Sequence, residues 1–346
     1  MASHALQGAA RHASFIAKSI SLTGLRRCAV SPRDLTSRAQ RPALTTCQRR
    51  QPWLRQQTRH HTTTTTTADS PGHPPSSSSS SSSASSSVSA SEVSHFSRLA
   101  SSWWDPHGPS RLLHLMNPLR HDFIKACLRR SPPPDQNYQY TYLDIGCGGG
   151  IFASSAARLP STAHVTAIDP TPDVIAVARS HARTDPILSR SDKLEYLNCA
   201  IEDLGPPAAE SSPSAPEGRR QYDIITLFEV LEHIDSPASF LETAIPHLKP
   251  GGWLVGSTIS RHPIAYLTTK LIAEAPLIGV VPRGTHDWNK YINPGELRGY
   301  FESGGAPGRW GDFVTQGVVY LPGLGWRNVT GSEDFGNYFF GVQKLE

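Results

Sequence analysis

The residues best suited to chemistry form a short cluster, Glu229, Glu232 and His233, directly after the apolar run 222–228. If a turn of helix begins here, the three side chains stand at i, i+3 and i+4 and share one face. Two carboxylates and an imidazole can hold Mg²⁺ or Mn²⁺, and the histidine also admits Zn²⁺. The cluster equally suits metal-free catalysis, with His233 as a general base oriented by a glutamate. We take His233 and Glu232 as catalytic candidates, and the residue types leave metal and no metal open.

A glycine-rich loop follows an earlier apolar run and carries Asp144, Gly146, Gly148 and Gly150. Glycines let the backbone turn sharply and let a ligand approach the main chain. A dinucleotide fingerprint needs glycine at the sixth position, which is Ile151 here, and a P-loop needs a Lys-Ser/Thr pair that does not follow. The spacing Asp-x-Gly-x-Gly-x-Gly resembles the first motif of the class I S-adenosylmethionine (SAM) methyltransferases. The resemblance implies that the loop passes close to SAM, with Asp144 accepting from its ammonium group or ordering the loop.

Asp169 ends the apolar run 163–169, 19 residues after Gly150. A carboxylate about 20 residues past such a loop is placed to bind the hydroxyls of a ribose. The alternative is that Asp169 only caps the next helix, with Pro172 in its first turn. We favour ribose binding, because the loop and the strand before it provide the context that the motif requires.

The elements that must position these residues alternate along the chain. Short apolar runs lie at 140–146, 163–169, 193–198, 222–228 and 252–258, and helix-like stretches lie at 150–159, 172–182 and 237–248. Such alternation predicts an α/β fold with a mostly parallel, doubly wound sheet covered on both faces. Ligands of these sheets bind beyond the carboxyl ends of the strands, where the glycine loop, Asp169 and the acid–histidine cluster all fall.

The charges divide the chain into a basic leader and an acidic remainder. Residues 1–66 hold ten Arg and one Lys against one acid, whereas the rest holds 22 basic and 28 acidic residues. The Arg-rich, acid-poor segment 1–59 predicts a mitochondrial transit peptide, and 60–91, rich in Thr and Ser, predicts a disordered linker before a folded domain at 92–346. A positive patch confined to a leader argues against nucleic-acid binding, and five Cys in 346 residues exclude a disulfide scaffold.

Several further motifs, taken together, are much more specific to one protein family than the glycine loop is. They are WWDP (103–106), NPLR (117–120), LDIGCGGGIF (143–152), FEVLEH (228–233), LKPGGWL (248–254) and VPRGTHDW-x-KYI-x-P-x-EL (281–297). In this order they resemble the ubiquinone-biosynthesis O-methyltransferases. The resemblance covers about 95–345, which is essentially the whole predicted domain.

The resemblance implies a class I methyltransferase sheet of seven strands, mostly parallel, with the last strand antiparallel. It implies SAM contacts from the glycine loop, including Gly146 and Gly148, and from Arg120, Asp169 and Phe228. Arg120 makes chemical sense, because a guanidinium group matches the carboxylate of SAM. The resemblance also implies that Glu229, Glu232 and His233 hold a divalent metal.

The implied activity is SAM-dependent methylation of ring hydroxyls on polyprenylated catechol-type intermediates of ubiquinone biosynthesis. The implied location is the matrix side of the mitochondrial inner membrane, with peripheral lipid contact and other ubiquinone-biosynthesis proteins as partners. Segment 262–285 is long and apolar enough to be a lid or membrane-contacting flap, although an ordinary core helix has the same pattern. A methyltransferase for another small phenol and a noncatalytic subunit with a SAM fold are the competing functions.

Overall fold

The computed structural model describes residues 87–346 except Pro134, Ser191, Pro206, 208–220, 267–287 and Glu346. All described residues belong to one unit of the chain. The predicted transit peptide, most of the predicted linker, and the predicted lid from residue 267 onward lie outside them. Helix α1 (Ala90–Leu99) begins at its cap residue Ser89, whose hydroxyl accepts a hydrogen bond from the Glu92 backbone N–H. The described fold therefore starts a few residues before position 92, where the composition had placed the domain boundary.

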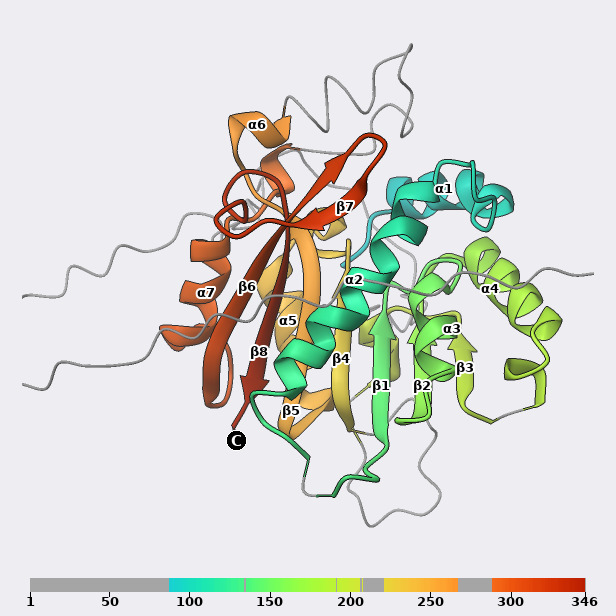
Figure 1. The fold of residues 1–346 in the computed structure, drawn as a ribbon, viewed down its shortest axis with the longest axis horizontal. Coiled ribbons are helices and arrows are strands. Elements are labelled where there is room, and N and C mark those ends of the chain that lie inside the picture. Colours follow the sequence, from blue (N-terminus) through green and yellow to red (C-terminus); the bar gives the residue numbers. More distant parts are fainter. Residues whose placement is uncertain are drawn as a thin grey trace, which may run out of the picture. The chain divides into compact units, whose positions relative to one another are not determined.

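A mixed sheet forms the centre of the fold (Figure 1). Within the described residues it has eight strands: β1 (Tyr140–Ile145), β2 (Thr162–Ile168), β3 (Leu194–Leu197), β4 (Tyr222–Phe228), β5 (Leu248–Ile259), β6 (Trp310–Leu321), β7 (Gly325–Asn328) and β8 (Asn337–Lys344). Their order is β3-β2-β1-β4-β5-β8-β6-β7. Strands β1 to β5 pair in parallel, and β8 runs antiparallel to β5. The predicted α/β fold and its antiparallel last strand are confirmed.

The sheet has one strand more than the seven expected. The extra strand is β7, which pairs antiparallel with the end of β6 at the edge of the sheet. The chain reverses between them through Gly323 and Gly325, whose φ angles are 82° and 76°. Glycine adopts this left-handed conformation without the steric cost that a side chain would impose. A tight turn that lets four more residues pair thus extends the sheet.

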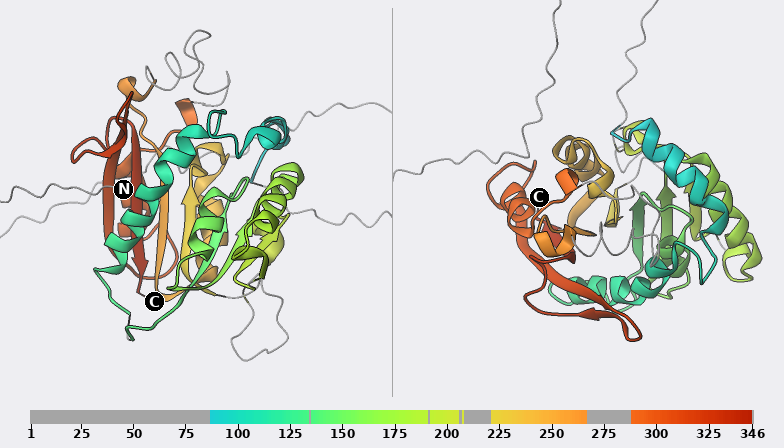
Figure 2. Two further views of the ribbon diagram at one scale, coloured as in Figure 1. Left: turned by 45° about the vertical axis from the view of Figure 1, so that its right-hand side comes forward. Right: turned by 90° about the horizontal axis from the view of Figure 1, so that it is seen from above.

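Helices cover both faces of the sheet. They are α2 (Arg111–Leu128), α3 (Ile151–Ala157), α4 (Pro172–Thr184), α5 (Pro237–Ala244), α6 (Pro263–Tyr266) and α7 (Pro294–Glu302). Figures 1 and 2 show α2, α3 and α4 on one face and α5 and α7 on the other. Helix α1 packs beside α4. The predicted helices at 150–159, 172–182 and 237–248 correspond to α3, α4 and α5.

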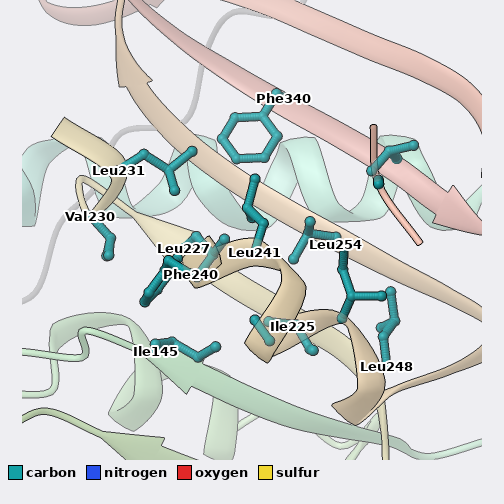
Figure 3. Close-up of a cluster of buried hydrophobic side chains, with 14 of the residues drawn as sticks. Ile145, Ile225, Leu227, Val230, Leu231, Phe240, Leu241, Leu248, Leu254 and Phe340 are labelled. Atoms are coloured by element: carbon teal, nitrogen blue, oxygen red, sulfur yellow. The ribbon is translucent and has the colours of Figure 1, made fainter. Parts of the chain in front are cut away.

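Two buried cores explain why the central strands are apolar throughout. Successive strand residues point to opposite faces, so Ile225 and Leu254 pack in the core with α5 and α7, as Figure 3 shows in part. Their sequence neighbours Ile224 and Val255 pack in the core with α2, α3 and α4. Burial on both faces holds the sheet rigid, so the residues that follow the carboxyl ends of β1, β2 and β4 are fixed at one edge. None of the described helices combines the length and the apolar character needed to cross a membrane.

Candidate active site

All the site residues predicted from the sequence line one cavity of about 630 Å³. They are Arg120, Asp144, Gly146, Gly148, Asp169, Phe228, Glu229, Glu232 and His233. Most come from the carboxyl ends of β1, β2 and β4 or from the residues just after them, and Arg120 comes from α2. The cavity therefore lies at the point where the strand order reverses between β1 and β4, the place where ligands bind to such sheets.

The glycine loop after β1 is covered by a tryptophan pair. Gly146, Gly148 and Gly150 have φ angles of 71°, 52° and 83°, which favour glycine. A Cβ atom on Gly148 would overlap with the indole ring of Trp103. The Trp104 Nε1–H donates a hydrogen bond of 2.8 Å to the Gly149 carbonyl. The two tryptophans of the WWDP motif thus pack against the glycine loop and hold it in place. The sequence alone did not indicate this role.

Arg120 and Asp144 line the cavity, and each has a buried polar atom without a hydrogen-bond partner in the described part of the chain. Arg120 is 4% exposed, burial lowers the pKa of its guanidinium group, and its Cζ lies 4.8 Å from the centre of the Phe228 ring. Asp144 Oδ1 accepts a 2.6 Å hydrogen bond from the Thr226 hydroxyl. Neither Arg120 Nε nor Asp144 Oδ2 finds a hydrogen-bond partner among the described residues. A buried cation and a buried carboxyl group with free capacity suit a zwitterion such as the amino-acid part of SAM.

Burial also raises the pKa of Asp144 to about 7 from an ordinary value of 3.8, despite the Thr226 hydrogen bond and the charge of Arg120. Between these two values the unfolded chain has released the proton and the folded chain retains it, so this group makes stability fall as pH rises. Without ligand, Asp144→Asn is expected to raise the melting temperature at pH 8 by several degrees more than at pH 5. The amide oxygen can still accept from Thr226. Thermal denaturation at both pH values measures the difference.

The matched control is Asp173→Asn in the first turn of α4, where the side chain is exposed. Its effect on the melting temperature should be the same at both pH values. A gain for Asp144→Asn that did not grow with pH would show that Asp144 is not held protonated by burial.

Asp169 connects the glycine loop to the start of α4. Its Oδ2 accepts from the Gly148 backbone N–H at 3.0 Å, and its Oδ1 accepts from the Thr171 N–H at 2.8 Å. Burial raises the pKa of Asp169, although both backbone donors oppose the shift. Asp169 therefore supports the segment that leads into α4, whose cap residue is Thr171. It also lines the cavity, and each carboxylate oxygen can accept a second hydrogen bond, so ribose binding stays a prediction.

Glu229 is the one described residue other than glycine with a positive φ, at 58°. Its backbone N–H donates to the Ser257 carbonyl at 3.1 Å, and the Ser257 hydroxyl donates to Glu229 Oε1 at 2.6 Å. β5 thus holds Glu229 in a strained conformation of the kind that concentrates at functional sites. The prediction that the three side chains share one helix face is wrong. The backbone of Glu229 has the left-handed conformation, and only Leu231–His233 form a short 3₁₀ turn.

Glu232 and His233 lie in that turn and still face the cavity. Glu232 is 4% exposed, and its Oε2 accepts from the Thr258 hydroxyl at 2.8 Å. Burial, together with the charge of Glu229, raises the pKa of Glu232 to about 7. His233 Nδ1 lies 3.1 Å from Glu92 Oε2. Burial opposes the charged imidazolium, but the Glu92 hydrogen bond and the charges of Glu232 and Glu92 outweigh burial and raise the pKa of His233.

The three side chains do not form a metal site as they stand. Across the described part of the chain, no three His, Cys, Asp or Glu side chains are grouped so that they could hold a metal ion. The carboxylates are instead hydrogen-bonded to Ser257 and Thr258, and the imidazole to Glu92. Two carboxylates and an imidazole remain a chemically suitable donor set, but their present positions do not fit an ion, and the metal prediction is not confirmed.

Sequence analysis missed the contribution of α1. Glu92 lies next to the Ser-rich segment and carries no motif, yet its carboxylate is hydrogen-bonded to His233. Phe96, one turn later, meets the His233 ring edge to face, with the ring centres 5.2 Å apart. The acidic side chain and the aromatic ring at helical spacing were the only available signals. They are too common to have identified a site.

Comparison with known proteins places the chain among methyltransferases. Residues 100–306 match a family model described as a methyltransferase domain. A Candida albicans protein named "Ubiquinone biosynthesis O-methyltransferase, mitochondrial" is 39% identical over 298 residues, which cover 75% of this chain and 86% of that protein. The Schizosaccharomyces pombe protein of the same name is 40% identical, covering 75% and 87%. A Methylobacterium "Ubiquinone biosynthesis O-methyltransferase" is 39% identical, covering 68% and 88%.

Proposed function

Because the chain belongs to the family of ubiquinone biosynthesis O-methyltransferases, we propose that it moves a methyl group from SAM to a ring hydroxyl of a polyprenylated catechol-type intermediate. One observation carries the proposal. Arg120 and Asp144, each with a buried polar atom that has no hydrogen-bond partner among the described residues, line the same cavity as the acidic residues Glu229 and Glu232. A cofactor binding site and proton-accepting groups are thus adjacent, as methyl transfer to a hydroxyl requires.

The reaction is an in-line displacement. The phenol oxygen forms a bond to the methyl carbon while the bond from that carbon to the sulfonium sulfur breaks, and the sulfur keeps the electron pair. A phenol with a pKa near 10 is mostly protonated at neutral pH, so its proton has to leave for the oxygen to attack efficiently. Holding the two reacting atoms about 3–3.5 Å apart supplies much of the remaining rate enhancement.

Glu232 and His233 are the proposed proton acceptors. The Glu232 carboxylate is buried against the cavity and binds a proton more tightly than an exposed glutamate, which makes it a better base for a phenol. Thr258 fixes its orientation from β5. His233 is oriented from the other side by Glu92, and it can accept the same proton through Nε2 while Nδ1 faces Glu92.

A divalent cation at Glu229, Glu232 and His233, Mg²⁺ or a similar ion, stays a prediction. Binding it would require the three side chains to exchange their contacts with Ser257, Thr258 and Glu92 for the ion. When bound, such an ion would lower the pKa of a coordinated hydroxyl. The roles of Arg120, Asp144 and Asp169 toward SAM do not depend on it.

Mass spectrometry of the reaction product tests the proposal. The full chain is incubated with SAM and 3,4-dihydroxybenzoate that carries a geranyl group at position 5. We expect one O-methylated product and an equal amount of S-adenosylhomocysteine. A protein that binds SAM but methylates neither this compound nor its geranylated quinol counterpart would contradict the proposed substrate class and leave the methyltransferase family unaffected.

The location follows from the leader and from the relatives. The acid-poor segment 1–59 has the composition of an import signal, and the Candida and Schizosaccharomyces proteins are named mitochondrial. We place the protein in the mitochondrion, on the matrix side of the inner membrane, with peripheral lipid contact and other ubiquinone-biosynthesis proteins as partners. A reporter protein fused to residues 1–91 should enter mitochondria. If the fused reporter stayed in the cytosol, the proposed mitochondrial location would be contradicted.

Truncation separates the leader from α1. Removing residues 1–86 is expected to leave the melting temperature and methyl transfer unchanged, because an import signal is not part of the mature protein and the Thr/Ser-rich linker has little apolar area to contribute to a core. Removing residues 1–99 also deletes Glu92 and Phe96, which contact His233, and turnover should fall at least about tenfold. Circular dichroism melts and product assays on both proteins measure this. Equal activity of the two truncated proteins would show that α1 does not serve the site.

A further inference from the structure

One wall of the cavity differs in chemistry from the rest. The charged groups come from the strand ends and from Arg120 in the third turn of α2. The first two turns of α2 and the segment 318–337 also line the cavity, and they contribute no charged side chain. The main wall residues are Leu112, Met116, Val318, Tyr320, Trp326 and Phe335. We call these six residues the apolar wall.

The polar tips of the aromatic wall residues are occupied. The Trp326 Nε1–H donates to the Leu112 carbonyl at 3.0 Å. The Tyr320 hydroxyl accepts from Arg111 Nη1 at 3.2 Å. Because these tips are already hydrogen-bonded, the rings present mainly hydrocarbon to the cavity. The same two hydrogen bonds tie the β6–β7 hairpin to the first turn of α2, so the wall is a preformed surface built from segments about 200 residues apart in sequence.

Exposed hydrophobic side chains are concentrated in the chain segment that carries much of the apolar wall. The large hydrophobic side chains that are exposed in the described residues are Leu115, Ile187, Leu321, Leu324, Val329, Phe335 and Leu345. Four of them lie within 321–335, the stretch of chain that also carries Trp326 and Phe335 of the wall, and Leu324 at the hairpin turn is 61% exposed. Phe335 belongs to both sets of residues, because it lines the cavity and is still 44% exposed. Concentrated exposed hydrophobic surface of this kind marks a binding surface more often than chance.

The wall starts at the reaction centre and leads outward. Met116 lies one helical turn before Arg120, the proposed partner of the SAM carboxylate, and Asn337 at the other end of segment 318–337 donates to Glu229 at 3.4 Å. A molecule whose ring lies beside Glu229 and Glu232 would therefore direct a substituent along hydrocarbon toward the hairpin. A small phenol without a tail would leave this surface unused. The geometry points to a ligand with a reactive ring and a flexible hydrocarbon chain.

We infer that the apolar wall holds the hydrocarbon tail of the substrate and that the tail leaves the cavity beside Phe335, which lines the cavity and is also exposed. This inference rests on the proposed function and adds the place of the tail to it. The sequence had pointed to segment 262–285 as a lid or membrane-contacting flap. The residues of the apolar wall lie outside that segment.

Equilibrium binding tests the inference without turnover. Calorimetry compares geranylated 3,4-dihydroxybenzoate with tail-less 3,4-dihydroxybenzoate, using the full chain saturated with S-adenosylhomocysteine. The wild type should bind the geranylated compound at least about tenfold more tightly, since each buried methylene adds to affinity. Leu112→Glu should reduce this preference to near one, mainly by weakening the geranylated compound. The new carboxylate lies in the first turn of α2, where negative charge is favourable to the helix.

Leu115→Glu is the matched control, because Leu115 lies on the same helix, is 39% exposed and does not line the cavity. It should keep the wild-type preference. Leu112→Ser, a milder change, should give an intermediate preference even if the glutamate variant folds poorly. No preference in the wild type, or an equal loss of both ligands in the Leu112 variants, would overturn the inference. A wild type that binds the geranylated compound selectively but does not methylate it would overturn the proposed function alone.

Discussion

Replacing Glu232 by glutamine is expected to lower the turnover number for O-methylation by at least about 100-fold while SAM affinity stays within about twofold. The loss of a positioned base typically costs this much. The glutamine keeps the shape of the side chain and an oxygen that can accept from Thr258. The variant should be at least as stable as the wild type at pH 8, because burial makes ionisation of the wild-type carboxyl costly. Steady-state kinetics, calorimetry with SAM and thermal melts measure the three quantities.

Glu302→Gln is the control, because this glutamate ends α7, is exposed and does not line the cavity. It should leave all three quantities unchanged. If Glu232→Gln retained full turnover, Glu232 could not be the base, and His233 would remain as the candidate.

Chelation distinguishes a metal role of the same cluster from a base role. If Glu229, Glu232 and His233 bind Mg²⁺, a chelator should stop wild-type turnover and added Mg²⁺ should restore it. Glu229→Ala should then recover part of its activity at high Mg²⁺, because only one ligand is missing. If His233 acts alone as the base, the chelator has no effect, and His233→Ala is the severe variant. Full activity of rigorously metal-free protein would show the metal prediction to be wrong and leave the methyltransferase assignment intact.

The Asp169→Ala variant is expected to weaken SAM binding by at least about 100-fold. Asp169 accepts hydrogen bonds from the backbone of Gly148 and Thr171 and is proposed to accept others from the ribose hydroxyls. Hydrogen bonds to a charged group are worth about 1.5–3 kcal/mol each, so losing two of them accounts for this factor. Calorimetric titration with SAM measures the affinity. The Glu232→Gln variant serves as the reciprocal control, because it should bind SAM normally and fail in turnover.

The Asp173→Ala variant tests whether the effect is specific to the cavity. Asp173 lies in the first turn of α4, the helix that follows Asp169, but is exposed, so SAM affinity should stay at the wild-type value. Unchanged SAM affinity in Asp169→Ala would remove the ribose role and leave Asp169 with only its structural contacts to Gly148 and Thr171. A fall in melting temperature without a fall in affinity would lead to the same conclusion.

Local sequence patterns were sufficient for the α/β fold and for bringing the candidate cofactor residues together around one cavity. Alternating apolar runs and helical stretches predict parallel strands, and the carboxyl ends of parallel strands have to meet at one edge. Asp144 lies at the end of β1, and the glycine loop, Asp169 and the acid–histidine cluster each follow a strand directly, so their convergence on one cavity could be expected. The antiparallel β8 was expected from the family resemblance, whereas β7 depends on a glycine turn too short to be recognised beforehand.

Only the tertiary structure decided how the side chains at the reaction centre are held. Glu92 and His233 are 141 residues apart, and no periodicity links them, so their contact depends on how α1 packs beside the sheet. The left-handed backbone of Glu229 is imposed by Ser257 on the neighbouring strand, which overrides the helical spacing of the cluster. The apolar wall likewise exists because Trp326 is hydrogen-bonded to the start of α2. Sequence determines which residues follow each strand, but contacts between distant segments determine their conformation, because packing and hydrogen bonds across the fold outweigh weak local preferences.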